Sequence, residues 1–372
     1  MKLKGAIIGV SGYGNVHYTD LMRCCKEGLM EFVGATVINR DVEQEKCAAL
    51  ESMGCKIYDD YKVMLDELSG KIDFCTIPTG ILHHKDMTIY ALQKHINVLV
   101  EKPAAPDMES INAMKLAEKE SGSFACVGFQ YNYHKTTHDL KALLLSGELG
   151  AVKRLKGYCL WPRNNQYYSR NGWSGKLFSN GLPVFDAPFS NATAHYLMLL
   201  LYFGGSVQDK GAMPVKVEGS LRRANPDIES CDTAELHYTL DNGLMLDYYC
   251  SHSCDKDEGP FLRIVCEKGE VTWTLSKITV KTESGEREIP VITDPFGSRE
   301  EMWHALFDRA AGKQSFITEL DLAACHTKAV DLAFKSLSIE KPESVQIIHN
   351  EDKTFRYLIP GFSKKAIEQV KK

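Results

Sequence analysis

The sequence predicts an α/β protein with two domains: a doubly wound parallel sheet over residues 1–128, and an α+β domain with a large, mostly antiparallel open sheet over residues 129–372. Three observations support this fold class. Short apolar runs alternate with helical patterns in the N-terminal part, as in a parallel sheet covered by helices on both faces. Apolar runs joined by turn residues follow in the C-terminal part, which indicates hairpins. A length of 372 residues exceeds what one hydrophobic core usually holds.

The N-terminal strands are expected where apolar runs are continuous, because strands buried on both faces show no alternation. These runs are GAIIGV, FVGATVI, IDFCTI, NVLV and FACVGF. Segments between them, such as DVEQEKCAALESMG and PDMESINAMKLAEKESG, have helical apolar spacing, acidic starts and glycine ends, which are helix signals. This alternation predicts a doubly wound sheet, in which ligands lie beyond the carboxyl ends of the strands.

The C-terminal domain is expected to combine helices with hairpins. Helical patterns occur at residues 134–145, 299–311 and 319–338 and in TAHYLMLLLYF, and AVKRLKGYCLW has the pattern of a strand. The runs AELHYTL, LMLDYYCSH and FLRIVCEKGEVTWTL are joined through Asp241-Asn242-Gly243 and Lys268-Gly269. Turn pairs of this kind between apolar runs predict antiparallel hairpins.

Charge and hydropathy argue against two classes of partner. The net charge is −5 at pH 7, and Lys and Arg are scattered along the chain, so the sequence has no electrostatic footprint for nucleic acid or an anionic membrane. No apolar run reaches the roughly 18 residues that a membrane helix needs. We therefore expect a cytoplasmic protein that binds a small molecule.

A glycine-rich turn directly follows the first predicted strand. It consists of Gly9-Val10-Ser11-Gly12-Tyr13-Gly14 and precedes a helical pattern. Such a turn lets backbone N–H groups and a helix N-terminus approach a pyrophosphate, although Ser11 occupies the place of the second glycine of G-x-G-x-x-G. We expect it to bind a dinucleotide. A merely tight strand-to-helix turn is the alternative.

The end of the second predicted strand carries the residues that separate NAD from NADP in such folds. A protein that binds NAD usually places an acid there to hold the ribose hydroxyls, whereas this chain has Asn39 and Arg40. Asn39 can hydrogen-bond a hydroxyl, and Arg40 can pair with a 2′-phosphate. The sequence therefore favours NADP(H) among the NAD(P) cofactors. For Arg40 the alternative is a solvated arginine at a helix start.

The run Glu101-Lys102-Pro103 follows the fourth predicted strand. A residue before proline is pushed toward extended geometry, so Lys102 is expected to stay at the strand end instead of entering the next helix. An ammonium fixed there can hydrogen-bond the oxygen of an alcohol or carbonyl whose carbon exchanges a hydride. A solvated strand end is the alternative, since Lys and Glu are mostly exposed.

Together these motifs resemble the Gfo/Idh/MocA oxidoreductases, a family named for glucose-fructose oxidoreductase, inositol dehydrogenase and a rhizopine catabolism protein. The resemblance covers the glycine turn with Asn15-Val16-His17, TIPTGILHH after the third predicted strand, the EKP run, VGFQY after the fifth, and Asn191-x-x-x-His195. It implies a Rossmann domain and a C-terminal domain whose open sheet mediates oligomerisation, hence a homo-oligomer, dimer or tetramer. It also implies redox chemistry at a carbinol of a sugar or polyol.

The resemblance further implies which residues contact the cofactor. The expected set is Gly9, Ser11, Gly12, Tyr13, Gly14, Asn15, Asn39, Arg40, Pro78, Thr79, His83, Glu101, Lys102 and Gln130. In the family the lysine of EKP is catalytic, and that role is carried over to Lys102.

The family's second catalytic element is an Asp-x-x-x-His pair on one helical face, in which the His is a general acid/base. Spacing of four brings two side chains onto one face of a helix. This chain matches the histidine with His195 but has Asn191 at the acid position. Asp186 supplies the missing charge or caps the helix. A satisfied core histidine is the alternative for His195.

The segment YCLWPRNNQYYSRNGWSGKLFSNG, residues 158–181, mixes aromatic and hydrogen-bonding side chains, as carbohydrate pockets do. The expected substrate-binding residues are Tyr131, Trp161, Arg163, Tyr168, Arg170, Trp173, Asp186 and His195. The two arginines raise the hypothesis of an acidic sugar. A loop packed by its own aromatics is the alternative.

No metal is expected. Cys250, His252 and Cys254 alternate along one strand, but a structural zinc site needs four ligands. The function that the sequence favours is an NAD(P)-dependent sugar or polyol dehydrogenase or reductase. Two alternatives stay open: redox-assisted glycoside cleavage or epimerisation with a recycled bound cofactor, and a non-catalytic NAD(P)-binding sensor, which Ser11 and Asn191 favour.

Overall fold

The structure is a computed structural model that describes residues 2–291 and 297–372. The chain forms two compact units: the N-terminal unit, up to Tyr133 together with Arg299–Ala323, and the C-terminal unit, His134–Ser298 together with Ala324–Lys372. These units depart from the predicted division at residue 128, because residues 299–323 belong to the N-terminal unit. Such a return of the chain leaves no signal in local sequence patterns.

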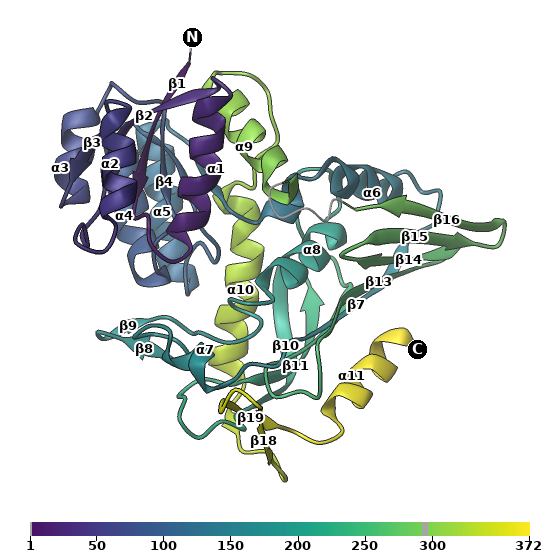
Figure 1. The fold of residues 1–372 in the computed structure, drawn as a ribbon. Helices are drawn as coiled ribbons and strands as arrows, with labels where there is room; N and C mark the ends of the chain where they lie inside the picture. The colour runs from purple at the N-terminus through teal and green to yellow at the C-terminus, as the bar shows by residue number, and fades with distance from the viewer. Residues whose placement is uncertain (1, 292–296) are drawn as a thin grey trace. The chain divides into compact units, whose positions relative to one another are not determined.

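The described part of the N-terminal unit is a six-stranded parallel sheet with helices on both faces (Figure 1). Its elements are β1 Leu3–Ile8, α1 Gly14–Lys26, β2 Met30–Thr36, α2 Gln44–Ser52, β3 Lys56–Tyr58, α3 Tyr61–Leu68, β4 Phe74–Ile77, α4 Ile81–Gln93, β5 Asn97–Val100, α5 Met108–Ser121, β6 Ala125–Val127 and the 3₁₀ turn η1 Gln130–Tyr133. The strand order is β3-β2-β1-β4-β5-β6. Strand order reverses at β1 and β4, which marks the ligand crevice of doubly wound sheets.

Local signals explain several element limits. The Asp60 side chain accepts the Lys62 N–H at 2.6 Å and begins α3, and that of Asp107 accepts the Ser110 N–H at 2.8 Å and begins α5. Such side-chain caps satisfy N–H groups that a helix start leaves unpaired. The parallel-sheet prediction is confirmed, but the prediction missed β3, which is only three residues long.

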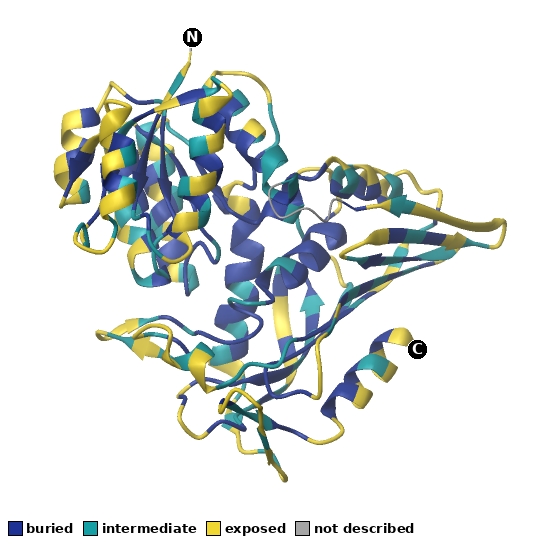
Figure 2. Ribbon diagram, viewed as in Figure 1, coloured by how far each residue is buried: buried dark blue, intermediate teal, exposed yellow. Residues whose placement is uncertain are grey.

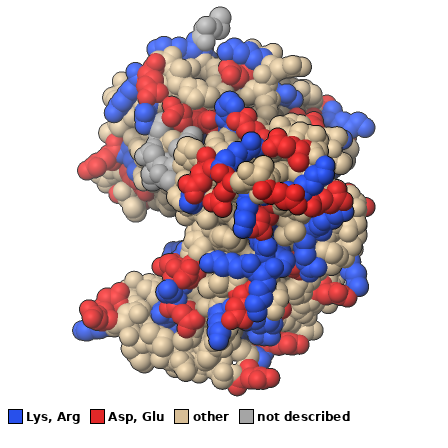
Figure 3. All heavy atoms as spheres, turned by 90° about the vertical axis from the view of Figure 1, so that its right-hand side faces the viewer, with Lys and Arg blue, Asp and Glu red and all other residues tan. Residues whose placement is uncertain are grey.

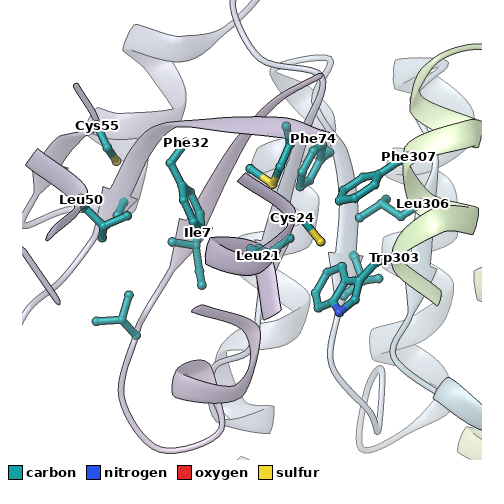
Figure 4. Packing of buried hydrophobic residues seen from close by; sticks show 14 of the residues in the cluster. Ile7, Leu21, Cys24, Phe32, Leu50, Cys55, Phe74, Trp303, Leu306 and Phe307 are labelled. Carbon is teal, nitrogen blue, oxygen red and sulfur yellow. The ribbon is translucent and has the colours of Figure 1, made fainter. Parts of the chain in front are cut away.

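The core of the N-terminal unit includes side chains from α9, Gly297–Ala310. Figure 4 shows Phe307 beside Phe74, and Trp303 and Leu306 in the same cluster as Cys24. The rings of Phe307 and Phe74 lie 5.6 Å apart. Burying aromatic and aliphatic side chains of this size stabilises the fold by about 1.5–3 kcal/mol each. A segment nearly 300 residues downstream in the chain thus completes the core formed by its start.

The C-terminal unit is an α+β unit, as predicted. Its described elements are α6 Lys135–Leu145, β7 Val152–Leu160, α7 Asn165–Ser169, β8 Phe178–Ser179, β9 Leu182–Pro183, α8 Ala194–Gly204, β10 Pro214–Arg222, β11 Thr233–Leu240, β12 Met245–Ser251, β13 Glu258–Cys266, β14 Gly269–Thr274, β15 Lys277–Thr282, β16 Gly285–Pro290, β17 Ile339–Glu340, β18 Gln346–His349, β19 Phe355–Leu358 and α11 Phe362–Lys371. Helix α10, Leu320–Ser336, extends from the N-terminal unit into this one.

The large sheet of the C-terminal unit has the order β16-β15-β14-β13-β7-β12-β11-β10-β17 among the described residues. Most neighbours are antiparallel, but β7 runs parallel to β12. Helices α8 and α11 pack on opposite faces of this sheet (Figure 1). Alternation along β7 explains this: Leu155 and Gly157 face α8, whereas Tyr158 packs with Ala366 and Val370 of α11.

Burial follows this layering. Figure 2 shows that α8 and much of α10 are buried, whereas the outward faces of α2 and α3 are exposed.

Lys and Arg are interspersed with Asp and Glu on the face that Figure 3 displays. None of the helices in residues 2–291 and 297–372 combines the length and apolar character that crossing a bilayer requires.

Candidate functional site

The glycine turn has the backbone that a dinucleotide needs. Gly9 has φ 89° and Gly12 φ 56°, a left-handed region that favours glycine. A Cβ on Gly12 would meet no atom within 4 Å, whereas one on Gly14 would lie 2.5 Å from the Gly9 carbonyl oxygen. Helix α1 therefore packs closely on the turn, and the surface at Gly12 is open to a ligand. These residues fit the expected pyrophosphate contact.

The loop after β4 adjoins the glycine turn. A Cβ on Gly9 would lie 3.7 Å from Thr79 Cγ2, and one on Gly14 would lie 3.6 Å from Pro78 Cγ. The predicted cofactor residues Pro78 and Thr79 therefore border the reversal between β1 and β4. His83 is exposed on the first turn of α4. Of the predicted cofactor residues in α1 and its turn, Tyr13 and Asn15 are exposed as well.

His84 connects two loops of this edge. Its Nε2 lies 3.0 Å from the Thr79 carbonyl oxygen, and its Nδ1 lies 2.9 Å from that of Pro103. Burial lowers the pKa of His84, which favours the neutral ring, and a neutral ring donates to only one of the two carbonyls. His84 thus holds the loop after β4 near the loop after β5.

Glu101, which is a predicted cofactor contact, is buried. Its Oε1 lies 2.9 Å from His17 Nε2, and its Oε2 accepts the backbone N–H of Lys102 at 3.1 Å. A Cβ on Gly128 would collide with Glu101 Oε1. The Glu101 carboxylate therefore fills the space that a side chain at position 128 would need. Lys102 is partly exposed. Glu101 therefore positions the backbone of Lys102 at the carboxyl end of β5.

The residues at the end of β2 contact the glycine turn and β3. Asn39 Nδ2 donates to Ser11 Oγ at 2.9 Å. Arg40 pairs with Asp59, Nε to Oδ1 at 2.7 Å, and its Nη2 donates to the Ile57 carbonyl at 3.1 Å. The guanidinium of Arg40 is therefore engaged toward β3. Gln130 is buried in η1, and Tyr131 is partly exposed beside it.

In the C-terminal unit, Asn191 contacts the acid proposed to compensate for it. Asn191 Nδ2 donates to Asp186 Oδ1 at 2.8 Å, and Asp186 Oδ2 accepts the Gly175 N–H at 2.7 Å. The expectation that Asn191 lies on the helix of His195 is wrong, because α8 begins at Ala194 and Asn191 lies in the turn before it. Asp186 does not cap α8, whose start has no side-chain cap bond.

His195 stands out within α8. Every residue of α8 is described, and all of them except His195 are buried. A core histidine would share the burial of its neighbours. The partial exposure of His195 instead fits a side chain that reaches a ligand or solvent.

In residues 158–181, the segment predicted to bind substrate, guanidinium groups lie between aromatic rings. Arg163 lies 5.1 Å and Arg170 3.6 Å from the Tyr167 ring centroid. Arg163 is also 5.6 Å from the ring of Trp161, and Arg170 is 5.7 Å from that of Trp173. Contacts at these distances are cation–π interactions. Tyr168 is turned inward: its Cδ1 would lie 3.1 Å from a Cβ on Gly175, and burial raises its pKa.

One groove of about 730 Å³ lies in the C-terminal unit. Arg163 and Tyr167 line it, together with Asp255, Lys256 and Arg356. The remaining predicted substrate residues do not line this groove. Among the described residues, no cluster of three or more His, Cys, Asp or Glu side chains is placed to hold a metal ion.

Comparison with known families shows to which family the chain belongs. Residues 3–129 match a family described as an oxidoreductase family with an NAD-binding Rossmann fold, and residues 137–272 match the GFO/IDH/MocA C-terminal domain. The two matches together cover more than half of the chain. The chain belongs to the Gfo/Idh/MocA family. The N-terminal domain of this Gfo/Idh/MocA protein thus has the NAD-binding Rossmann fold of its family, and the resemblance inferred from its motifs is confirmed.

Curated relatives match part of this Gfo/Idh/MocA protein. Glucose-6-phosphate 3-dehydrogenase from Bacillus subtilis is 31% identical over 157 residues, which is 41% of this chain and 41% of that protein. Inositol 2-dehydrogenase 4 from Saccharopolyspora erythraea is 27% identical over 187 residues, 50% of this chain and 51% of that protein. The chain therefore spans about half or less of the length of these relatives.

Solved structures share the fold over most of the chain. The WlbA dehydrogenase from Bordetella pertussis, in complex with NADH and UDP-GlcNAcA, has a TM-score of 0.72 at 20% identity and covers 90% of this chain and 96% of that chain. An oxidoreductase from Thermotoga maritima has a TM-score of 0.73 at 18% identity and covers 90% and 97%. At these identities the likeness confirms the fold class.

Proposed function

We propose that this Gfo/Idh/MocA protein is an NAD(P)-dependent dehydrogenase or reductase that acts on a secondary hydroxyl or ketone of a sugar, polyol or sugar derivative. The observation that carries the proposal is the position of Lys102 directly after β5, with its backbone N–H bound by the buried Glu101 carboxylate. Ligands of doubly wound sheets lie at that edge. The names of the relatives, a sugar phosphate dehydrogenase and inositol dehydrogenases, support the substrate class.

The nicotinamide ring, when bound, supplies hydride transfer. In the proposed mechanism the Lys102 ammonium hydrogen-bonds the substrate oxygen and offsets the charge that develops there. The partly exposed imidazole of His195 accepts or returns the hydroxyl proton. The rings and guanidinium groups of residues 158–181 orient the sugar. Asn15, Pro78, Thr79, His83, Gln130 and Tyr131 stay proposed contacts on the basis of the family resemblance.

Two alternative functions use the same site. A non-catalytic sensor was favoured by Asn191, but the hydrogen bond from Asn191 to Asp186 supplies a carboxylate beside the acid position of the family and so supports catalysis. A redox-neutral glycoside cleavage or epimerisation would consume substrate without a net change in nicotinamide absorbance. Saturable nucleotide binding with no turnover of any sugar would instead support the sensor.

Lys102→Met tests the proposal. We expect kcat/KM on the best substrate of a sugar and polyol panel, assayed with NAD and with NADP, to fall by about 10²–10⁴-fold. Nucleotide affinity, measured by fluorescence titration, should fall much less than kcat/KM, because Met keeps the length of the side chain and the other predicted cofactor contacts are unchanged. Lys119→Met, on the exposed face of α5, is the matched control. Unchanged turnover in the Lys102 variant would refute the catalytic role.

One further expectation stays a proposal, and a second is weakened by the contacts of Arg40. The homo-oligomer is proposed to form through the part of the C-terminal sheet that α11 leaves uncovered, and light scattering of the full chain tests it. The preference for NADP(H), predicted from Asn39 and Arg40, is opposed by the contacts of Arg40 with Asp59 and Ile57.

A further inference from the structure

We infer that Glu43 is the acidic residue that receives the adenosine ribose hydroxyls in this protein, and that it makes the chain select NAD(H) over NADP(H). The inference rests on the proposed function and adds the cofactor preference. Rossmann proteins that prefer NAD usually carry this acid at the end of the second strand. Here that position is Asn39, and Glu43 brings a carboxylate to the same place from four residues further along.

The side chain of Glu43 turns back toward the glycine turn. Glu43 is the N-cap residue of α2, yet its side chain makes no capping hydrogen bond. Instead, Glu43 Oε1 accepts the hydroxyl of Ser11 at 2.7 Å, and Ser11 also accepts the amide of Asn39 at 2.9 Å. Ser11 stands where the usual motif has its second glycine. The serine that departs from the motif thus joins the carboxylate to the turn.

The charge of Glu43 is maintained. Its pKa is lowered, first by the hydrogen bond from Lys46 and then by that from Ser11. Lys46 Nζ lies 2.7 Å from Glu43 Oε2 and also donates to the Val10 carbonyl at 2.8 Å. A carboxylate has about four acceptor sites, so the two observed bonds leave capacity for two ribose hydroxyls.

The groups that would attract a 2′-phosphate are engaged elsewhere. The guanidinium of Arg40 contacts Asp59 and the Ile57 carbonyl, and Lys46 is held by Glu43 and Val10. A 2′-phosphate carries roughly two negative charges at neutral pH, and Glu43 would face it with another. Like charges brought together disfavour the ligand that carries them.

Exposed apolar side chains beside this polar group suit an adenine ring. Ile38, which precedes Asn39, is 84% exposed, and Val42, which precedes Glu43, is 72% exposed. Residues of this type are among those most often fully buried. Their exposure on both sides of Asn39 and Glu43 is an independent sign that a partly apolar ligand covers this surface.

Direct binding tests the inference without any assay of turnover. NADH and NADPH are titrated separately by calorimetry into the full-length protein, Glu43→Gln and Glu45→Gln, after melting curves confirm that each variant is folded. The Gln at position 43 keeps an acceptor for Ser11 but removes the charge, and Glu45 is an exposed acid on the same helix. We expect wild type and the control to bind NADH at least about tenfold more tightly than NADPH, and Glu43→Gln to lose most of that difference through weaker NADH binding together with tighter NADPH binding.

Tighter binding of NADPH than NADH by wild type, or an unchanged ratio in Glu43→Gln, would overturn the inference. Arg40→Ala separates the rival assignment: selective weakening of NADPH in that variant would place the 2′-phosphate on Arg40 instead. Absence of binding by either nucleotide would refute the proposed function itself and the inference with it. Binding of both nucleotides without the predicted preference would refute only the role of Glu43.

Discussion

His17 Nε2 and Glu101 Oε1 lie 2.9 Å apart in the interior of the N-terminal unit, with side chains that are 0% and 5% exposed. The ring of Trp303 packs edge-on against His17, with ring centroids 4.9 Å apart, and its Nε1 donates to Asp20 at 3.1 Å. Glu101 in turn binds the N–H of Lys102. Side chains from α1 and α9 therefore support the strand end that presents the proposed catalytic lysine.

Removing His17 should destabilise this unit. His17→Ala leaves a buried carboxylate without its ring partner, and we expect the free energy of unfolding in urea to fall by about 3 kcal/mol. His17→Gln should recover most of the loss, because the Gln amide can donate from nearly the position of Nε2. His83→Ala, which changes an exposed histidine of the same unit, serves as the control. Equal stability of wild type and His17→Ala would contradict the prediction.

Restoring the family's acid should harm this particular chain. In Asn191→Asp, two carboxylates would face each other where Asn191 now donates to Asp186 at 2.8 Å, and such pairs raise the pKa of one member. A raised folded-state pKa costs stability above the unfolded pKa, so we expect a lower melting temperature than wild type at pH 7. The difference should shrink as the pH falls toward about 4, near the pKa of an unfolded Asp.

The double swap Asp186→Asn with Asn191→Asp is the matched control for that prediction. It keeps one carboxylate and one amide, and the amide oxygen introduced at position 186 can still accept the Gly175 N–H. Its melting temperature at pH 7 should lie above that of Asn191→Asp. If the single variant melts like wild type at pH 7, Asp186 and Asn191 do not interact as the structure indicates.

The sequence predicted those helices and strands whose residues show an apolar periodicity or a motif. β1, β5 and α8 are long or apolar enough to be found, and the glycine turn and EKP identified the edge of the sheet. The three-residue β3 is too short to show a pattern. The spacing of four between Asn191 and His195 was misleading. It predicts that both residues lie on one helix, but the helix begins only at Ala194.

Contacts between residues far apart in the sequence explain the features that the sequence did not predict. Arg299 donates to Asp20 at 2.5 and 3.0 Å, and nothing near either residue in the sequence indicates the other. Glu43 was missed for a related reason: the rule for cofactor preference examines the residue after the strand, whereas here the carboxylate reaches back from the start of the next helix. Side-chain direction, which local patterns do not contain, decided both cases.

His237 links a pH dependence to the C-terminal sheet. Its Nδ1 lies 2.7 Å from Asp247 Oδ1 and its Nε2 3.3 Å from Glu235 Oε1. Hydrogen bonding first to Asp247 and then to Glu235 raises the pKa of His237 to about 9, above the 6.5 of an unfolded histidine. The stability from this charge is therefore fully present below the unfolded pKa and is lost as the pH rises through the folded one.

His237→Gln should accordingly lower the free energy of unfolding by about 1 kcal/mol at about pH 6, the scale of partly exposed ion pairs. The difference from wild type should fade by about pH 10, above the folded pKa. Urea titrations at both pH values measure it. His349→Gln, at an exposed position on β18, should show no such trend. A deficit that stays constant with pH would mean that His237 acts through packing and not through charge.

Lys141 should show the opposite trend with pH. Its side chain is 0% exposed, and Nζ donates to the carbonyls of Tyr202 and Gly205, at 2.5 Å each, where α8 ends. Lys141→Met keeps the apolar stem but leaves these carbonyls without their donor, at a cost of about 1–3 kcal/mol for each buried group. Burial lowers the pKa of Lys141 to about 7, below the 10.5 of an unfolded lysine, so the folded state binds fewer protons between these values. Wild type should therefore gain stability over Lys141→Met as the pH rises from about 7 to about 10, measured by urea unfolding, and a gap that narrows over that range would contradict the assignment.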